Sequence, residues 1–432
     1  MVIEINLVGR LFLSEVLLII ILPLLIVKRG RLLLHPLPRT VIILAFLWLA
    51  GQIITDFIRE TPFQDWTRGW AKITFLILNF SSIYLLLIND TKRIIIFFIG
   101  FLIISPTLDY LVTPTELLLY DPWKFGIGGS VVSLVILFAM WRKIARFRLL
   151  PVLLIFALGL FSIYMGSRAN GGLLILSAGY LYIHSKPKLR YWLKHLSISR
   201  IVIIILAAIF LGWGVLTGYS IAARSGWLGE AAKNKYYQQS GDYGILLGGR
   251  AEILVSTQAI RDSPIIGHGS WAKNREYKEL LFHLRQEMGY FANEYMLQGS
   301  DLIPSHSHLF GVWVEAGILG ALFWVWVFYL IVRLLFGLFR IEHDLLPLFV
   351  VNAMSALWAI LFSSFGAEAR LSWAFFIVLF IFAVQLVHRS KSLQLTAKGT
   401  GVIELNGKVI ELNGKYLMTV LFNQINLIKK WS

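Results

Sequence analysis

Residues 308–332 read HLFGVWVEAGILGALFWVWVFYLIV, and this stretch sets the class of fold. Within it stand a single carboxylate, Glu315, and one histidine at the first position. About 20 predominantly apolar residues are enough for a helix to cross the hydrocarbon core of a bilayer. The stretch therefore predicts a membrane-spanning helix.

The whole chain has the same character. It has 432 residues, of which 57% are hydrophobic and 15% are charged, and its mean hydropathy is +0.72. Soluble domains carry about 25% charged residues, so this composition excludes a water-soluble protein. The chain has no cysteine, which excludes disulfides, thiolate zinc sites, iron–sulfur clusters and cysteine nucleophiles.

We predict an all-α, polytopic transmembrane helical bundle of about 11–12 spans with a long extracytoplasmic helical segment. Apolar runs of suitable length predict eleven spans, at residues 11–27, 40–58, 72–88, 94–111, 126–141, 149–166, 171–184, 201–219, 308–332, 345–363 and 371–387. The first run lacks the basic start and the small-residue cleavage site of a signal peptide, so we expect it to be retained as a span.

Lysine and arginine follow every odd-numbered span, and such clusters mark cytoplasmic loops. They are Lys28, Arg29, Arg31, Arg39, Lys92, Arg93, Arg142, Lys143, Arg146, Arg148, Lys186, Lys188, Arg190, Lys194, Arg200, Arg333, Arg340, Arg389 and Lys391. We therefore expect these loops and the tail in the cytoplasm and the N-terminus outside. The net charge of +16 then follows from topology, and nucleic acid is not an expected partner.

This topology divides the chain into four parts. They are the first eight spans in residues 1–219, an outer segment at 220–307, the last three spans in 308–388, and a cytoplasmic tail at 389–432. A structureless loop as long as the outer segment would be unusual. We predict helices in it at 250–261 and 273–288, separated by a turn.

The tail contains a tandem repeat. Residues 402–408 read VIELNGK, and residues 409–415 repeat this sequence. Each Asn-Gly pair favours a tight hairpin turn between alternating residues. The repeat predicts either a small three-strand meander or a duplicated, loosely ordered tail.

The first polar motif on the outer side is Gly166-Ser-Arg-Ala-Asn-Gly-Gly172, which joins the sixth and seventh predicted spans. Arg168 stands at its apex. An arginine at this depth either reaches the lipid phosphates or binds an anionic substrate, and the motif alone leaves both interpretations open.

The second motif is Gly248-Gly-Arg250, which opens a predicted helix, followed by Ser263-Pro-Ile-Ile-Gly-His-Gly269. Arg250 is a fixed cation near a helix start, and Gly267 and Gly269 permit a close backbone approach. Both features suit an anionic ligand. The alternative is a solvated surface arginine followed by an ordinary turn.

The third motif is Ser305-His-Ser-His308 at the start of the span that holds Glu315. An interfacial polar cap is the simplest interpretation. Glu315 lies seven residues after His308 on the same helical face and could orient it. His306 and His308 could also begin a metal site, but the sequence offers no third ligand at a recognisable spacing and no Asp-x-Asp, so we predict no metal and no cofactor.

In this order, G-S-R-x-N-G-G, R…D-S-P-I-I-G-x-G and H-S-H-L…E-A-G-I-L-G resemble the O-antigen ligase and polymerase family of bacterial membrane glycosyltransferases. The resemblance covers about residues 160–330. It implies an all-α bundle in the bacterial inner membrane with a long periplasmic segment between two late spans. Members take a glycan from an undecaprenyl-diphosphate carrier. Ligases, which usually have twelve spans with both termini cytoplasmic, pass it to lipid A–core, and polymerases pass it to another carrier-linked repeat.

The resemblance also implies roles for site residues. The family's arginines contact the carrier diphosphate and its motif histidine is the proposed base, and we assign these catalytic roles to Arg168, Arg250 and His308. Supporting candidates are His306, Glu315, Arg261, Gly267 and Gly269. Two guanidiniums could stabilise the departing diphosphate without a metal. Histidine titrates near neutral pH, and attack from the far face of the sugar would invert the anomeric centre.

We therefore predict metal-independent glycan transfer at the periplasmic membrane face, with O-antigen ligation as the first hypothesis and polymerisation as the alternative. The expected partners are the carrier-linked donor, the acceptor glycan and membrane lipids. A lipid-linked glycan transporter is the second alternative, and a structural or sensor protein is the third. A transporter would need ionisable residues along a path through the bilayer, whereas Asp56, Lys72, Asp109, Arg168 and Glu315 lie toward outer span ends.

Overall fold

A computed structural model describes residues 4–6, 10–112, 114–141, 144, 147–194, 210, 212–214, 217–244, 248, 250–400, 402–405 and 408–411. These residues form an all-α helical bundle with two small hairpins, which confirms the predicted fold class. Among the residues that the structure describes, five helical stretches are long and apolar enough to cross a membrane, and the protein is membrane-embedded. They are Pro36–Ile58, Phe63–Leu87, Thr91–Val112, His308–Leu338 and Ala367–Ser390.

The elements of the first half are β1 (Glu4–Asn6), β2 (Arg10–Phe12), α1 (Leu13–Arg29), η1 (Gly30–Leu34), α2 (Pro36–Ile58), α3 (Phe63–Leu87), α4 (Thr91–Ile99), the π-helical η2 (Gly100–Ile104), α5 (Ser105–Val112), α6 (Glu116–Tyr120), α7 (Gly128–Met140), α9 (Leu150–Tyr164), α10 (Arg168–Ser185) and α11 (Pro187–Lys194). Those of the second half are α13 (Glu230–Gln239), α15 (Glu252–Asp262), α16 (Arg275–Glu287), η3 (Glu294–Leu297), α17 (His308–Leu338), α18 (Leu346–Phe362), α19 (Ala367–Thr400), β3 (Val402–Leu405) and β4 (Lys408–Glu411).

Each predicted span coincides with a helix except the eighth, at residues 201–219, which lies almost wholly outside the described residues. The helices differ from the predicted spans mainly in length. The ninth span continues past residue 332 as α17, and the last continues past residue 387 as α19. The fourth combines α4, η2 and α5 into one apolar stretch with a π-helical turn inside it.

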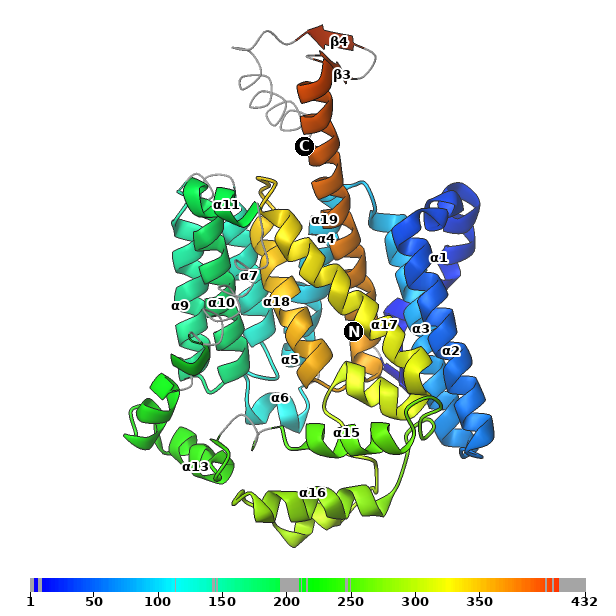
Figure 1. Ribbon diagram of the computed structural model, residues 1–432, viewed down its shortest axis with the longest axis vertical. Coiled ribbons are helices and arrows are strands. Elements are labelled where there is room, and N and C mark those ends of the chain that lie inside the picture. Colours follow the sequence, from blue (N-terminus) through cyan, green and yellow to red (C-terminus); the bar gives the residue numbers. More distant parts are fainter. Residues whose placement is uncertain are drawn as a thin grey trace.

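The outer segment lies across one end of the bundle (Figure 1). Helices α15 and α16 confirm the predicted helices at 250–261 and 273–288 to within two residues at each end. Both lie across the ends of the long helices, whereas α11 and the C-terminal part of α19 lie at the opposite end (Figure 1). We call the first of these the α15–α16 end, and the candidate site is found there.

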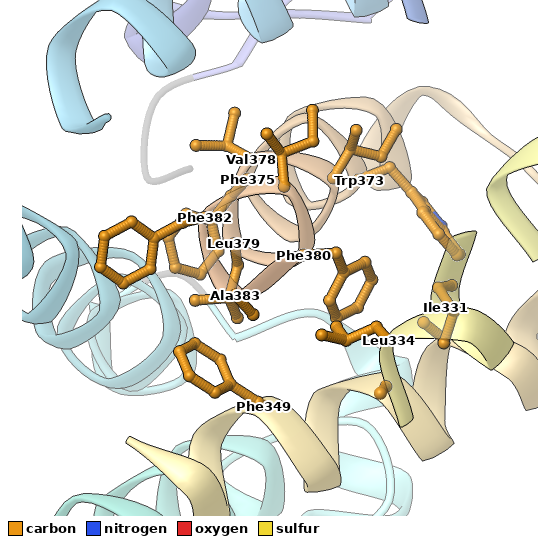
Figure 2. Packing of buried hydrophobic residues seen from close by; sticks show 14 of the residues in the cluster. Ile331, Leu334, Phe349, Trp373, Phe375, Val378, Leu379, Phe380, Phe382 and Ala383 are labelled. Atoms are coloured by element: carbon orange, nitrogen blue, oxygen red, sulfur yellow. The ribbon is translucent and has the colours of Figure 1, made fainter. Parts of the chain in front are cut away.

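The core is built around α19 (Figure 2). Phe375, Phe380 and Phe382 of α19 are buried against Phe349 of α18 and Leu334 of α17. A helix that is apolar on all sides is stable only when it is surrounded, and in a bilayer close side-chain packing holds such helices together. The sequence of α19 therefore fits its central position.

A buried ion pair joins α19 to α1. Arg370 donates from Nε and from a terminal nitrogen to the two carboxylate oxygens of Glu15, at 2.6 and 2.5 Å. Asn79 of α3 donates to the same carboxylate at 2.7 Å. Arg370 also donates to the Arg10 carbonyl at 2.6 Å, so both charges of the pair are hydrogen-bonded, as buried charges must be.

The tail forms a hairpin over the first copy of the repeat and the start of the second. Strands β3 and β4 are antiparallel, and Leu405 pairs with Lys408. The predicted third strand lies outside the described residues. A second hairpin, β1–β2, which the sequence did not predict, pairs Glu4 with Phe12.

Candidate functional site

Arg250 lies at the α15–α16 end, two residues before α15 begins. Its guanidinium carbon is 5.7 Å from the ring centroid of Trp358 and 5.9 Å from that of Phe362. Both rings belong to the last turns of α18. Cation–π contacts of this kind strengthen when they are shielded from water, and here they hold the guanidinium against the end of a membrane helix.

Arg168 is the first residue of α10, and its guanidinium carbon lies 4.8 Å from the ring centroid of Tyr219. The glycines of its motif have a structural role. Gly166 adopts a φ of +81° in the turn. A Cβ at Gly171 would stand 2.6 Å from the Gly159 carbonyl of α9, so only glycine lets the two helices pack this closely.

The structure brings Arg168 and Arg250 into one electrostatic environment. Helix α10 packs against α18, and the N-terminal end of α10 and the C-terminal end of α18 both lie toward α15 (Figure 1). Partial burial lowers the pKa of Arg250, the Glu252 carboxylate raises it, and the Arg168 guanidinium lowers it further.

His306 lies two residues before α17 begins, and its neighbour Ser307 contacts the end of α18 where Arg250 also lies. The neighbouring Ser307 hydroxyl donates to the Ile360 carbonyl at 2.8 Å, and Ile360 lies between Trp358 and Phe362. His306 is exposed. Partial burial lowers the pKa of His306, the Arg250 and Lys124 cations lower it as well, and the Glu252 carboxylate opposes them.

His308 does not share that exposure. Its side chain is buried, with a relative exposure of 2%. Its ring centroid lies 4.8 Å from that of Trp324, 5.3 Å from Phe365 and 5.1 Å from Trp373. Nδ1 donates to the Ser363 carbonyl at 2.5 Å. This ring is closed to solvent, whereas His306 is exposed.

Glu315 does not orient His308. It accepts a hydrogen bond from Lys72 of α3, with 2.6 Å between Nζ and Oε2. The seven-residue spacing placed both side chains on one helical face, but it did not show that a cation from another helix pairs with the carboxylate.

The glycines of the second motif contact protein backbone. The His268 and Gly269 amides donate to the Val314 and Glu315 carbonyls at 2.7 and 3.0 Å. This loop meets α17 where Gly317 interrupts the helix with a φ of +62°. A Cβ at Gly267 would stand 2.6 Å from the Gly317 amide nitrogen. The predicted close approach is present, and it is made to the backbone of α17.

Helices α2 and α3 hold the other side of this loop. The buried Asp56 carboxylate accepts from the Ser270 amide at 2.6 Å, from the Ser270 hydroxyl at 2.7 Å and from Trp70 Nε1 at 2.8 Å. Arg59 donates to the Gly267 carbonyl at 3.0 Å and to the Ser263 hydroxyl at 2.8 Å. The loop is therefore fixed at both sides, which sets the position of α15, and of Arg250 before it, relative to α17.

Two predictions remain, the supporting role of Arg261 and the metal site. Arg261 lies exposed in the last turn of α15. His306 and His308 do not form a metal site together, and across the described ranges no group of three or more His, Asp or Glu side chains is placed to hold a metal ion.

Sequence reasoning missed five contributors to the site. They are Lys124, Tyr219, Glu252, Trp358 and Phe362. Only Glu252 carried a usable signal, because it follows Arg250 at the start of a predicted helix. Trp358 and Phe362 sit in an apolar span, where aromatic residues have no distinguishing pattern. Three cations, Arg168, Arg250 and Lys124, dominate this group. We refer to them, together with His306 and Glu252, as the cationic cluster.

No family model matches the sequence, and no curated protein or solved structure matches it. The fold and the site therefore define a class only: an all-α, membrane-embedded protein with a cationic cluster at one end of its bundle.

Proposed function

We propose that the protein transfers a glycan from a polyprenyl-diphosphate carrier to an acceptor hydroxyl at the membrane surface, without a metal. The observation that carries this proposal is the cationic cluster, in which Arg168 and Arg250 stand with an exposed histidine at one end of a lipid-embedded bundle. A lipid-linked dianion at the bilayer surface is the ligand that such a cluster suits.

The arginines would act on the leaving group. When the bond between the anomeric carbon and the phosphate oxygen breaks, negative charge develops on the diphosphate. Arg168 and Arg250 can each form paired hydrogen bonds to phosphate oxygens. Because Arg250 lies partly buried over aromatic rings, its charge is less screened by water, and such preorganised donors stabilise transition states strongly.

His306 would serve as the base. Its lowered pKa keeps the imidazole neutral near pH 7, the form that can accept a proton. The acceptor oxygen attacks the anomeric carbon from the face opposite the diphosphate, its proton passes to His306, and the configuration inverts. Glu252 would stabilise the imidazolium that forms. His308 would support the fold of the α17 start.

The direction of the protein in the membrane rests on the charge pattern. Lys186, Lys188 and Arg190 belong to or border α11, which lies at the end opposite α15 and α16 (Figure 1). Since such clusters mark the cytoplasmic side, the cationic cluster would face the periplasm of a bacterial inner membrane. Single cysteines at Lys188 and Glu294 should label from opposite sides, and the native chain has no cysteine to interfere.

Ligation to lipid A–core is the first hypothesis for the acceptor, and polymerisation is the alternative with the same donor chemistry. The decisive experiment incubates purified protein with an undecaprenyl-diphosphate-linked glycan in excess chelator. One arm contains lipid A–core and the other contains a second carrier-linked repeat. Transfer in only the first arm supports a ligase, and transfer in only the second supports a polymerase. Movement of the donor across vesicles without transfer would instead favour a transporter.

A further inference from the structure

Helices α15 and α16 lie side by side (Figure 1), and hydrogen bonds join them at both ends. Near the start of α16, the Tyr277 hydroxyl donates to the Asp262 carboxylate in the last turn of α15 at 2.5 Å. Near the end of α16, Arg285 donates from a terminal guanidinium nitrogen to the Gly248 carbonyl at 3.1 Å. The two helices therefore run in opposite directions, and Arg250 lies at the end that Arg285 closes.

Arg285 joins two segments of the chain with one side chain. Its terminal nitrogen holds the buried Gly248, two residues before Arg250. Its Nε donates to the carbonyl of Phe291, in the segment that follows α16, at 3.0 Å. A guanidinium presents its donors in a rigid planar fork, so the two carbonyls are held at a fixed separation and orientation.

Two further hydrogen bonds join the same two segments. The Asp242 amide donates to the Met288 carbonyl at 3.0 Å. The hydroxyl of the buried Tyr290 donates to the Gly244 carbonyl at 2.8 Å. Of these attachments, the one that Arg285 makes is the closest along the chain to the cationic cluster.

The other side of Arg250 is attached to α15. The Ile253 amide donates to the Arg250 carbonyl at 3.1 Å, and Ala251 between them is fully buried. With Gly248 held on one side and Ala251 on the other, the guanidinium is placed over the aromatic rings of α18. Because the energy between charges depends on their separation, a shift of the Arg250 backbone would change its effect on the rest of the cationic cluster.

We propose that Arg285 is a positioning residue of the cationic cluster, which holds Arg250 against the end of α18 by fixing the Gly248 carbonyl. Arg285 acts through Arg250 and is not itself a catalytic residue. Its effect on glycan transfer rests on the proposed function. Its effect on the electrostatics of His306 does not, because that effect depends on where the Arg250 charge lies.

The protonation of His306 reports the position of Arg250 without any substrate. The charged groups that act on His306 are Arg250, Lys124 and Glu252, and the Arg250 cation lowers the pKa of the imidazole. NMR titration of the full-length protein, labelled in histidine and purified in detergent, measures this pKa, and the resonance is assigned by its loss in His306→Gln. Arg285→Gln should raise the pKa of His306, because Arg250 is no longer held close to it.

The matched control is Arg275→Gln, which removes one positive charge from the start of the same helix, where Arg275 pairs with Glu279 at 2.8 Å. It should leave the pKa of His306 unchanged. Arg285→Lys separates position from charge, because lysine keeps the charge but lacks the planar fork. It should also raise the pKa of His306, and it decides the question if Arg285→Gln does not fold. An unchanged pKa in Arg285→Lys, or equal rises in Arg285→Gln and Arg275→Gln, would overturn the proposal.

Single-turnover rates with purified donor provide a second measurement. Both Arg285 variants should transfer glycan about 10–10²-fold more slowly than the wild-type protein, and Arg275→Gln should match the wild type. In an Arg250→Gln background, Arg285→Gln should add little, since the effects of residues that act through one another are not additive. A full additional loss in that background would contradict the positioning role. A wild-type protein that transfers no glycan would refute the proposed function, and the NMR titration would then decide the role of Arg285.

Discussion

Lys72 of α3 and Glu315 of α17 form an ion pair with 2.6 Å between Nζ and Oε2. Glu315 lies two residues before Gly317, where the helix is interrupted. The loop that contains His268 and Gly269 forms its backbone hydrogen bonds with α17 at the same place. The start of α17 is thus held by an ion pair on one side and by backbone hydrogen bonds on the other. His306 lies two residues before this helix begins, so that attachment also sets its position.

The first prediction concerns the docked loop. Gly267 and Gly166 both have a positive φ, at +88° and +81°. Alanine at either position should cost about 1–2 kcal/mol of stability from backbone strain. At Gly267 the new Cβ would also meet the Gly317 amide nitrogen at 2.6 Å, whereas at Gly166 it would meet no atom within 4 Å.

Gly267→Ala should therefore lower the thermal unfolding temperature clearly more than Gly166→Ala, with an additional cost of about 1–3 kcal/mol from the forced backbone shift. Thermal unfolding of both purified variants in the same detergent measures the difference. Equal effects would show that the loop does not depend on the close approach to α17.

The second prediction concerns the diphosphate clamp. Arg250→Lys should reduce the rate of glycan transfer by about 10²–10³, because a point charge does not reproduce the paired hydrogen bonds of a guanidinium. Arg261→Lys, an exposed change in the neighbouring helix α15, is the matched control and should leave the rate within a few-fold of wild type. Single-turnover rates with purified donor measure both, and unimpaired transfer by Arg250→Lys would refute the clamp.

Hydropathy and turn chemistry were enough to predict most of this fold. The spans that became α2, α17 and α19 are continuous apolar runs, and α15 and α16 follow the usual helix signals in a polar segment. The electrostatic partners were not predictable in the same way. Glu15 and Arg370 are 355 positions apart in the chain, and only the packing of α1 on α19 brings them together.

The candidate site was predictable in outline only. Arg168 and Arg250 could be found because an arginine beside glycines at the end of a span is distinctive. The choice between His306 and His308 depends on which ring faces the core, and a two-residue spacing at a helix start does not reveal that. The motif around Gly267 was correctly singled out, but its backbone partner at Gly317 belongs to the tertiary structure.

The third prediction separates the two histidines. His306→Gln should lower kcat for glycan transfer by about 10²–10⁴, the usual contribution of a general base, while stability stays within about 0.5 kcal/mol of wild type. His308→Ala should instead destabilise the protein by about 3 kcal/mol, because it leaves a cavity among Trp324, Phe365 and Trp373. Activity and thermal unfolding of the two purified variants measure these effects. The reverse pattern would return the base to His308.

The last prediction uses the charges around His306. As a base, His306 must be neutral, so kcat/KM should fall as the pH drops through its pKa in the free enzyme. Partial burial, Arg250 and Lys124 lower that pKa from its ordinary value of 6.5, and Glu252 raises it. The acid limb of the pH profile should therefore lie below pH 6.5.

Two neutralising variants should move this limb in opposite directions. Lys124→Gln removes a cation that disfavours the imidazolium, so the pKa of His306 rises and the limb moves to higher pH. Glu252→Gln removes the carboxylate that favours the imidazolium, so the pKa falls and the limb moves to lower pH. Profiles of kcat/KM for the wild-type protein and both variants, at one ionic strength because exposed charges are screened by salt, provide the measurement. If neither limb moves, or if both move the same way, a group other than His306 accepts the proton.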